Sequence, residues 1–113
     1  MLAGCSDGME QVAGPFYIGR FEVHGDPWLF RCPAEPPSGC ANDTLPDGKV
    51  LRAGGDDRYI TFLLPEGYYY FRRLPQERRG WGNNPEVIVG PLSEDQFAEA
   101  SRELRLPALD VEP

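Results

Sequence analysis

The 113-residue chain carries 18 acidic residues against 11 basic ones, which gives a net charge of −7 at neutral pH. This acidity argues against a nucleic-acid partner, because nucleic-acid binding depends on Lys and Arg side chains that neutralise phosphates. It equally argues against adhesion to an anionic membrane surface through the domain's own residues. The length fits one domain, and the 13 glycines and 12 prolines favour short strands and turns over long helices.

The N-terminal residues 2–5 (LAGC) resemble a bacterial lipobox, in which small residues precede a cysteine that is lipidated. The charged and apolar segments of a signal peptide are missing ahead of this motif, so we expect the precursor to begin farther upstream. The motif predicts lipidation at Cys5 and a flexible tether over residues 1–14. It also places the protein on the periplasmic face of the cell envelope, and Ser6 favours the outer membrane. A chance cysteine in a cytosolic tail is the alternative.

The other two cysteines, Cys32 and Cys40, lie eight positions apart around a segment rich in Pro and Gly. In an oxidising compartment this spacing predicts a disulfide, which would stabilise the fold by about 2–3 kcal/mol through loop entropy. A zinc site is the competing interpretation. It is disfavoured because zinc takes about four ligands, and only His24 could join the two thiols.

In chain order, alternating and β-branched patterns predict six short strands. The first two are joined by a turn over residues 24–27 and form a hairpin. A loop with Pro and Cys follows over 33–48, and Gly54 to Asp57 divides the third strand from the fourth. The predicted strands cover 16–23, 28–32, 49–53, 59–64, 68–73 and 86–89.

The C-terminal segment has the strongest local signal for a helix. Ser93 can cap the helix and Gln96, three positions later, completes a capping box. Leu92 and Phe97 occupy the two positions of a hydrophobic staple, and Pro107 ends the helix.

Together these elements predict an α+β fold: an antiparallel sheet of about five to six short strands with one C-terminal helix packed on it. The domain is expected over residues 15–107, followed by a tail over 108–113.

Several segments resemble a group of small, uncharacterised bacterial lipoproteins that also begin at a lipobox cysteine. The shared features are 57–60 (DRYI), 68–71 (YYYF), 89–92 (VGPL), and Phe97 and Leu104 after them. The resemblance covers about half the chain and implies the fold and the envelope location, while it leaves function open. This sequence departs from the group in a longer insert over 74–85.

Residues for catalysis are scarce. The single histidine, His24, lies in a turn-forming HGDP segment, and no G-x-S-x-G motif is present. Asp56 and Asp57 are adjacent within a glycine-containing turn, which favours a solvated turn over a glycosidase carboxylate pair. Residues 42–48 lack the ligand spacing of a calcium loop. We therefore expect no enzyme activity, no metal and no cofactor.

The most suggestive segment runs from residue 72 to 81 and carries four arginines and a tryptophan in an otherwise acidic protein. Arg and Trp are the residues that most often anchor protein interfaces. The alternative is a solvated hairpin tip whose tryptophan folds back on the sheet. The predicted partner-binding residues are Arg72, Arg73, Arg78, Arg79 and Trp81.

These features favour a monomeric, non-enzymatic binding protein anchored to the membrane through its N-terminal lipid. The expected partner is an envelope or periplasmic protein, as for an immunity or inhibitor protein. A second hypothesis is a structural envelope lipoprotein that binds glycan through the aromatic strand at 68–71. A third, a small hydrolase centred on His24 and Asp26, has the least support.

Overall fold

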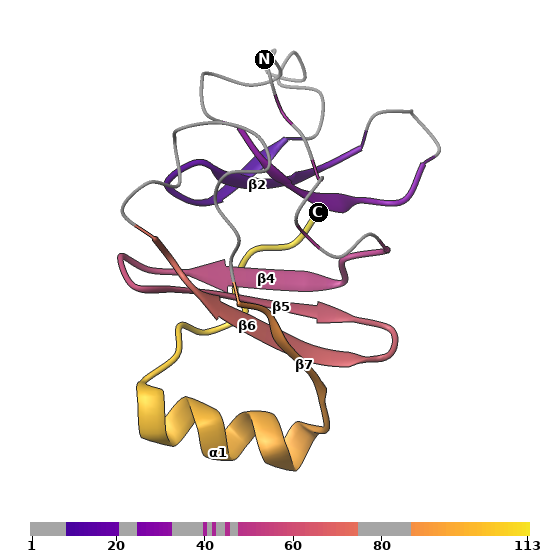
Figure 1. The fold of residues 1–113 in the computed structure, drawn as a ribbon. Coiled ribbons are helices and arrows are strands. Elements are labelled where there is room, and N and C mark those ends of the chain that lie inside the picture. The colour runs from indigo at the N-terminus through magenta and orange to yellow at the C-terminus, as the bar shows by residue number, and fades with distance from the viewer. Residues whose placement is uncertain are drawn as a thin grey trace.

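The computed structural model describes residues 9–20, 25–32, 40, 42, 45, 48–74 and 87–113. The described elements form three layers, with one sheet above, a second sheet in the middle and the helix below (Figure 1). The upper sheet has the order β1 (Glu10–Ala13), β2 (Phe16–Gly19), β3 (Trp28–Arg31). The middle sheet has the order β4 (Arg52–Gly55), β5 (Tyr59–Leu64), β6 (Gly67–Arg72), β7 (Val89–Leu92), and α1 (Glu94–Leu104) follows it.

The α+β class, the antiparallel pairing and the C-terminal helix are confirmed, but the prediction of a single sheet is wrong. The predicted hairpin of β2 and β3 separates from the later strands and forms the upper sheet with β1. Strand β1 was not predicted, because Glu10–Ala13 is short and half polar and lies where a tether was expected. Alternation along a strand shows which side chains share a face, but it does not show which strands pair across long range.

The main core lies between the two sheets. The Phe16 ring on β2 meets the Phe71 ring on β6 edge to face, with centroids 5.2 Å apart. Phe62 on β5 also packs against Phe71 and shares its face of the middle sheet. These rings are fully buried, and they join the two sheets into one folded unit.

The opposite face of the middle sheet carries the helix. Tyr68 on β6 stacks on Phe97 of α1 with ring centroids 4.8 Å apart. The predicted capping box is confirmed: the backbone N–H of Gln96 donates to Ser93 Oγ, and the backbone N–H of Ser93 donates to Gln96 Oε1. No residue of α1 is fully buried, so the helix covers the sheet only along one apolar stripe.

The C-terminal segment after α1 turns back along the same face. Thr61 on β5 is fully buried, and its hydroxyl lies 3.2 Å from the carbonyl oxygen of Pro107. Farther along, Val111 and Ala53 exchange two backbone hydrogen bonds of 2.8 Å at the edge of β4. Residues 108–113, expected as a tail, therefore include a residue that pairs with β4.

Gly54 and Gly55 belong to β4, rather than to the divider that the sequence predicted. A side chain at Gly54 would collide with the carbonyl of Ala108 on one face of the strand. A side chain at Gly55 would collide with Ala13 of β1 on the other face. Gly54 therefore lets the backbone of the C-terminal segment approach β4 on one face, Gly55 makes room for side chains on the other, and the turn begins only at Asp56.

Candidate functional site

Two exposed arginines flank one tyrosine at the end of the middle sheet where β5 begins and β6 ends. The guanidinium carbon of Arg58 lies 5.7 Å from the centre of the Tyr59 ring, and that of Arg72 lies 5.8 Å from the same point. Tyr70 meets Tyr59 edge to face at 6.2 Å. We call Arg58, Tyr59, Tyr70 and Arg72 the arginine corner.

The register of the β5–β6 hairpin assembles this corner. Tyr59 stands directly opposite Arg72, and Thr61 stands opposite Tyr70, so these side chains share one face of the sheet. The turn between β5 and β6 contains only Pro65 and Glu66, which fixes that register.

The turn between β4 and β5 positions Arg58. Asp56 Oδ1 accepts hydrogen bonds of 2.8 Å from the backbone N–H groups of Arg58 and Tyr59. The backbone N–H of Asp56 in turn donates to the carbonyl of Tyr59. The Asp56 carboxylate is thus a turn-forming group, as the solvated-turn interpretation of Asp56 and Asp57 predicted.

Cation–π contact contributes about 0.5–1 kcal/mol at exposed positions, enough to bias a flexible arginine toward one arrangement. Within the part of the chain that the structure describes, the guanidiniums of Arg58 and Arg72 contact the Tyr59 ring and form no ion pair. Both side chains are exposed, while Tyr59 is only 9% exposed. The corner therefore presents two positive, planar hydrogen-bond donors on a fixed aromatic base.

Arg73 was predicted, together with Arg72, as a partner-binding residue, but its side chain contacts other parts of the fold. Its Nη1 donates to the carbonyl oxygen of Asp56 at 2.8 Å, and its backbone N–H donates to the carbonyl of Arg58. Its guanidinium also lies against Gly14 in the β1–β2 turn, where a side chain would collide with it. Arg73 thus connects the two sheets and is half-buried.

The remaining predicted partner-binding residues, Arg78, Arg79 and Trp81, lie outside the described residues, as do Cys5 and His24. Arg58 was not predicted, although a signal was available. A two-residue turn at Pro65 and Glu66 places Tyr59 opposite Arg72, and the residue before Tyr59 is an arginine.

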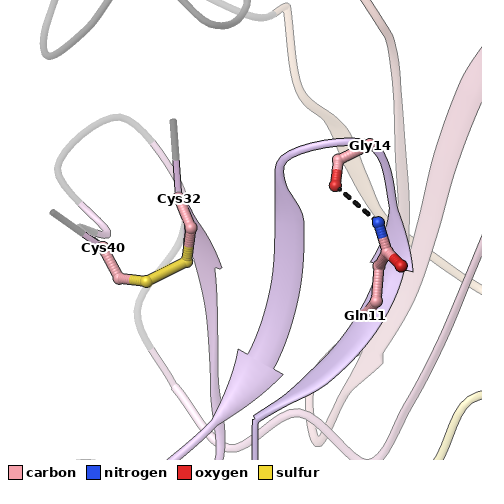
Figure 2. Close-up of a disulfide and its surroundings, with 4 residues drawn as sticks. All are labelled: Gln11, Gly14, Cys32 and Cys40. Carbon is pink, nitrogen blue, oxygen red and sulfur yellow. Dashed lines mark hydrogen bonds between the residues drawn. A yellow bond between two sulfur atoms is a disulfide. The ribbon is translucent and has the colours of Figure 1, made fainter. Parts of the chain in front are cut away.

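The predicted disulfide is confirmed between Cys32 and Cys40, with an S–S distance of 2.06 Å (Figure 2). Cys32 follows β3 and is buried, and its backbone N–H donates to the carbonyl of Pro15. Figure 2 also shows the neighbouring β1–β2 turn, in which Gln11 Nε2 donates to the carbonyl of Gly14 at 3.0 Å. With both sulfurs in this bond, neither is available as a zinc thiolate.

The aromatic strand β6 divides as alternation requires. Tyr69 and Phe71 are buried in the core, and Tyr69 stacks on Phe62 with centroids 5.0 Å apart. Tyr68 lies under Phe97, and Tyr70 faces Tyr59. These rings are engaged with one another, which leaves less flat ring surface for stacking on a sugar.

Arg31 on β3 is a fully buried arginine that sequence reasoning did not single out. Its guanidinium lies over the Phe16 ring, 5.7 Å from the ring centre. It stands directly opposite Phe16 in the register of β2 and β3 and, being buried, is not part of the exposed arginine corner.

In the described part of the chain, no group of three or more His, Cys, Asp or Glu side chains could hold a metal ion. Among the same residues, no helix is long and apolar enough to span a bilayer. Comparison of the chain with family models, with curated proteins and with solved structures finds no significant match.

Proposed function

We propose that this chain is a non-enzymatic lipoprotein of the bacterial envelope that binds a protein partner, as an immunity or inhibitor protein does. The observation that carries the proposal is the arginine corner, where Arg58 and Arg72 are exposed and held on one tyrosine ring. In the sequence, the predicted partner-binding residues Arg78, Arg79 and Trp81 follow β6, the strand that carries Arg72. Arginine and aromatic residues together are typical of the centre of protein interfaces.

The envelope location is part of the same proposal. A disulfide between Cys32 and Cys40 suits an oxidising compartment, and it leaves Cys5 as the remaining cysteine of the three. Lipidation of Cys5 would anchor the monomer to a membrane, with the outer membrane favoured by Ser6. Metabolic labelling with an alkyne fatty acid tests this directly: the wild type takes up label and Cys5→Ala does not. Label retained by Cys5→Ala would contradict the assignment.

Partner binding is tested by capture from periplasmic extract of the source organism, comparing the wild type with charge-reversed variants. We expect one protein to be retained by the wild type and lost with Arg58→Glu/Arg72→Glu. Arg52→Glu is the matched control, because Arg52 is exposed on the same face of the sheet but lies opposite Leu63, at the far end of β5. A parallel Arg78→Glu/Arg79→Glu variant extends the test to the segment beyond β6.

Retention of every captured protein by both double variants would contradict the proposed binding surface. Loss of the partner with Arg52→Glu as well would show that the variants act only through the net charge of the chain.

A further inference from the structure

We propose that the arginine corner recognises an acidic segment of its partner, whose carboxylates pair with the guanidiniums of Arg58 and Arg72. This inference rests on the proposed protein-binding function and names the chemistry of the partner.

The two guanidinium donors lie close enough together to act on one ligand. Both guanidiniums are within 6 Å of the centre of a single ring, so one short peptide segment can contact both. A guanidinium presents a planar pair of N–H donors that matches the two oxygens of a carboxylate. The nearly buried Tyr59 ring holds the arginines while it leaves their outer edges to solvent. Binding then costs less side-chain entropy than it would for two unsupported arginines.

Charge is unevenly distributed over the molecule. The chain as a whole carries −7, so an acidic partner is repelled by most of its surface. At the end of the middle sheet, the exposed Arg58 and Arg72 bring two positive charges to one tyrosine ring. A local positive site on a negative protein favours docking orientations that bring an acidic segment to that site.

The aromatic rings of the corner favour a peptide ligand over a polysaccharide. Recognition of a sugar uses an exposed, flat ring face. Tyr59 is 9% exposed and is flanked by both arginines, and Tyr70 meets it edge to face. The corner therefore offers guanidinium edges to its ligand, and carboxylates on a flexible peptide can adjust to these edges.

Asp57 supplies an internal check on this inference. It is exposed in the same turn, next to Arg58, while the carboxylate of Asp56 is engaged with backbone N–H groups. Asp57 opposes an incoming carboxylate, so Asp57→Asn should strengthen binding about two- to threefold. Glu99→Asn, on the exposed side of α1, carries the same change in charge outside this turn and should have a smaller effect.

The experiment measures fluorescence anisotropy of a labelled peptide of alternating Glu and Gly with the full chain. We expect salt-sensitive binding that weakens at least about tenfold with Arg58→Glu/Arg72→Glu and persists with Arg52→Glu. The same peptide with Gln in place of Glu should not bind. Arg72→Lys, which keeps the charge but removes the planar fork, should weaken binding less than Arg72→Glu does.

Two outcomes would overturn the inference: no binding of the Glu peptide, or equal binding by the wild type and the double variant. Preferential binding of a sulfated polysaccharide of matched charge would assign the corner to a glycan instead. The captured partner separates this inference from the function on which it rests. Suppose that the partner is lost with Arg58→Glu/Arg72→Glu and yet binds equally well after its acidic residues are replaced by neutral ones. In that case the protein-binding function stands, and recognition of an acidic segment is refuted.

Discussion

Tyr69 shows how one hydroxyl at the boundary of the core responds to pH. Its ring is buried against Phe62, and its Oη donates to Glu66 Oε2 at 2.9 Å. Burial raises the pKa of Tyr69 above its ordinary value near 10, and the hydrogen bond to Glu66 and the negative charge of that residue raise it further.

This shift predicts an alkaline loss of stability. Because the pKa of Tyr69 is higher in the folded state, the unfolded chain releases the proton first as pH rises, and unfolding is then favoured. The stability contributed by the protonated Tyr69 hydroxyl is fully present below about pH 10 and is lost as pH rises through the pKa of the folded state. Between neutral and alkaline pH, Tyr69→Phe should therefore lose less of its free energy of unfolding, measured by urea denaturation, than the wild type does. If the free energies of unfolding of the wild type and Tyr69→Phe differ by the same amount at neutral and alkaline pH, this assignment is contradicted.

Asp56 organises the turn that presents Arg58, and its removal should be felt in stability. Asp56→Ala loses two hydrogen bonds to backbone N–H groups and is expected to lower the free energy of unfolding by about 1 kcal/mol. Asp57→Ala, the exposed neighbour, should change it by less than about 0.5 kcal/mol. Urea denaturation of both variants checks the contrast, and equal effects would show that the Asp56 bonds contribute little.

At the scale of elements, local patterns predicted those segments whose signals are local. The capping box at Ser93 marked the start of α1, and alternation located β5 and β6 to within a residue. The Gly54-Gly55 pair was misread as part of a turn, because glycine marks both turns and close backbone contacts. Which of the two applies depends on Ala108 and Ala13, which are distant in sequence.

The candidate site, too, was predictable from the sequence only where its signal is local. Arg72 stood out by its charge within the sequence, whereas Arg58 became part of the site only through the hairpin register. Arg73 has the same side chain as Arg72 but contacts the Asp56 carbonyl, because neighbouring residues on a strand point to opposite faces.

The close approach of the C-terminal segment to β4 gives a sharp test. Gly54→Ala should cost about 2–3 kcal/mol in the full chain, because the new methyl group collides with the Ala108 carbonyl. In a chain that ends at Pro107 the Ala108 carbonyl is absent and the tightest remaining contact is Thr61 Oγ1 at 3.0 Å, so the same substitution should cost less than in the full chain. A double-mutant cycle from urea unfolding measures this difference. If Gly54→Ala lowers the free energy of unfolding equally in both chains, its effect does not come from a collision with Ala108.

At the scale of the whole molecule, the fold joins two small sheets through a shared aromatic core, and a disulfide closes the loop that follows β3. The upper sheet has only three short strands, so it depends on packing against the middle sheet and on the Cys32–Cys40 disulfide. The arginine corner lies on the middle sheet, on the face opposite that core.

This separation predicts that the disulfide serves stability more than binding. Replacing both Cys32 and Cys40 with Ala should lower the free energy of unfolding by about 2–3 kcal/mol, and reduction of the wild type should match it. Below the unfolding temperature, affinity for the Glu peptide should be unchanged. An affinity that falls in the folded, disulfide-free protein would instead connect the upper sheet with the binding surface.

Strand β1 gives the molecule a direction relative to its proposed anchor. The strand runs from Glu10 toward the turn at Gly14, and Gly14 lies against Arg73 at the same end of the molecule as the arginine corner. A chain held by a lipid on its N-terminal side enters the fold at Glu10, about 10 Å along the strand from that turn. On the proposal that Cys5 carries the lipid, the anchored side of the chain and the arginine corner then lie toward opposite ends of β1.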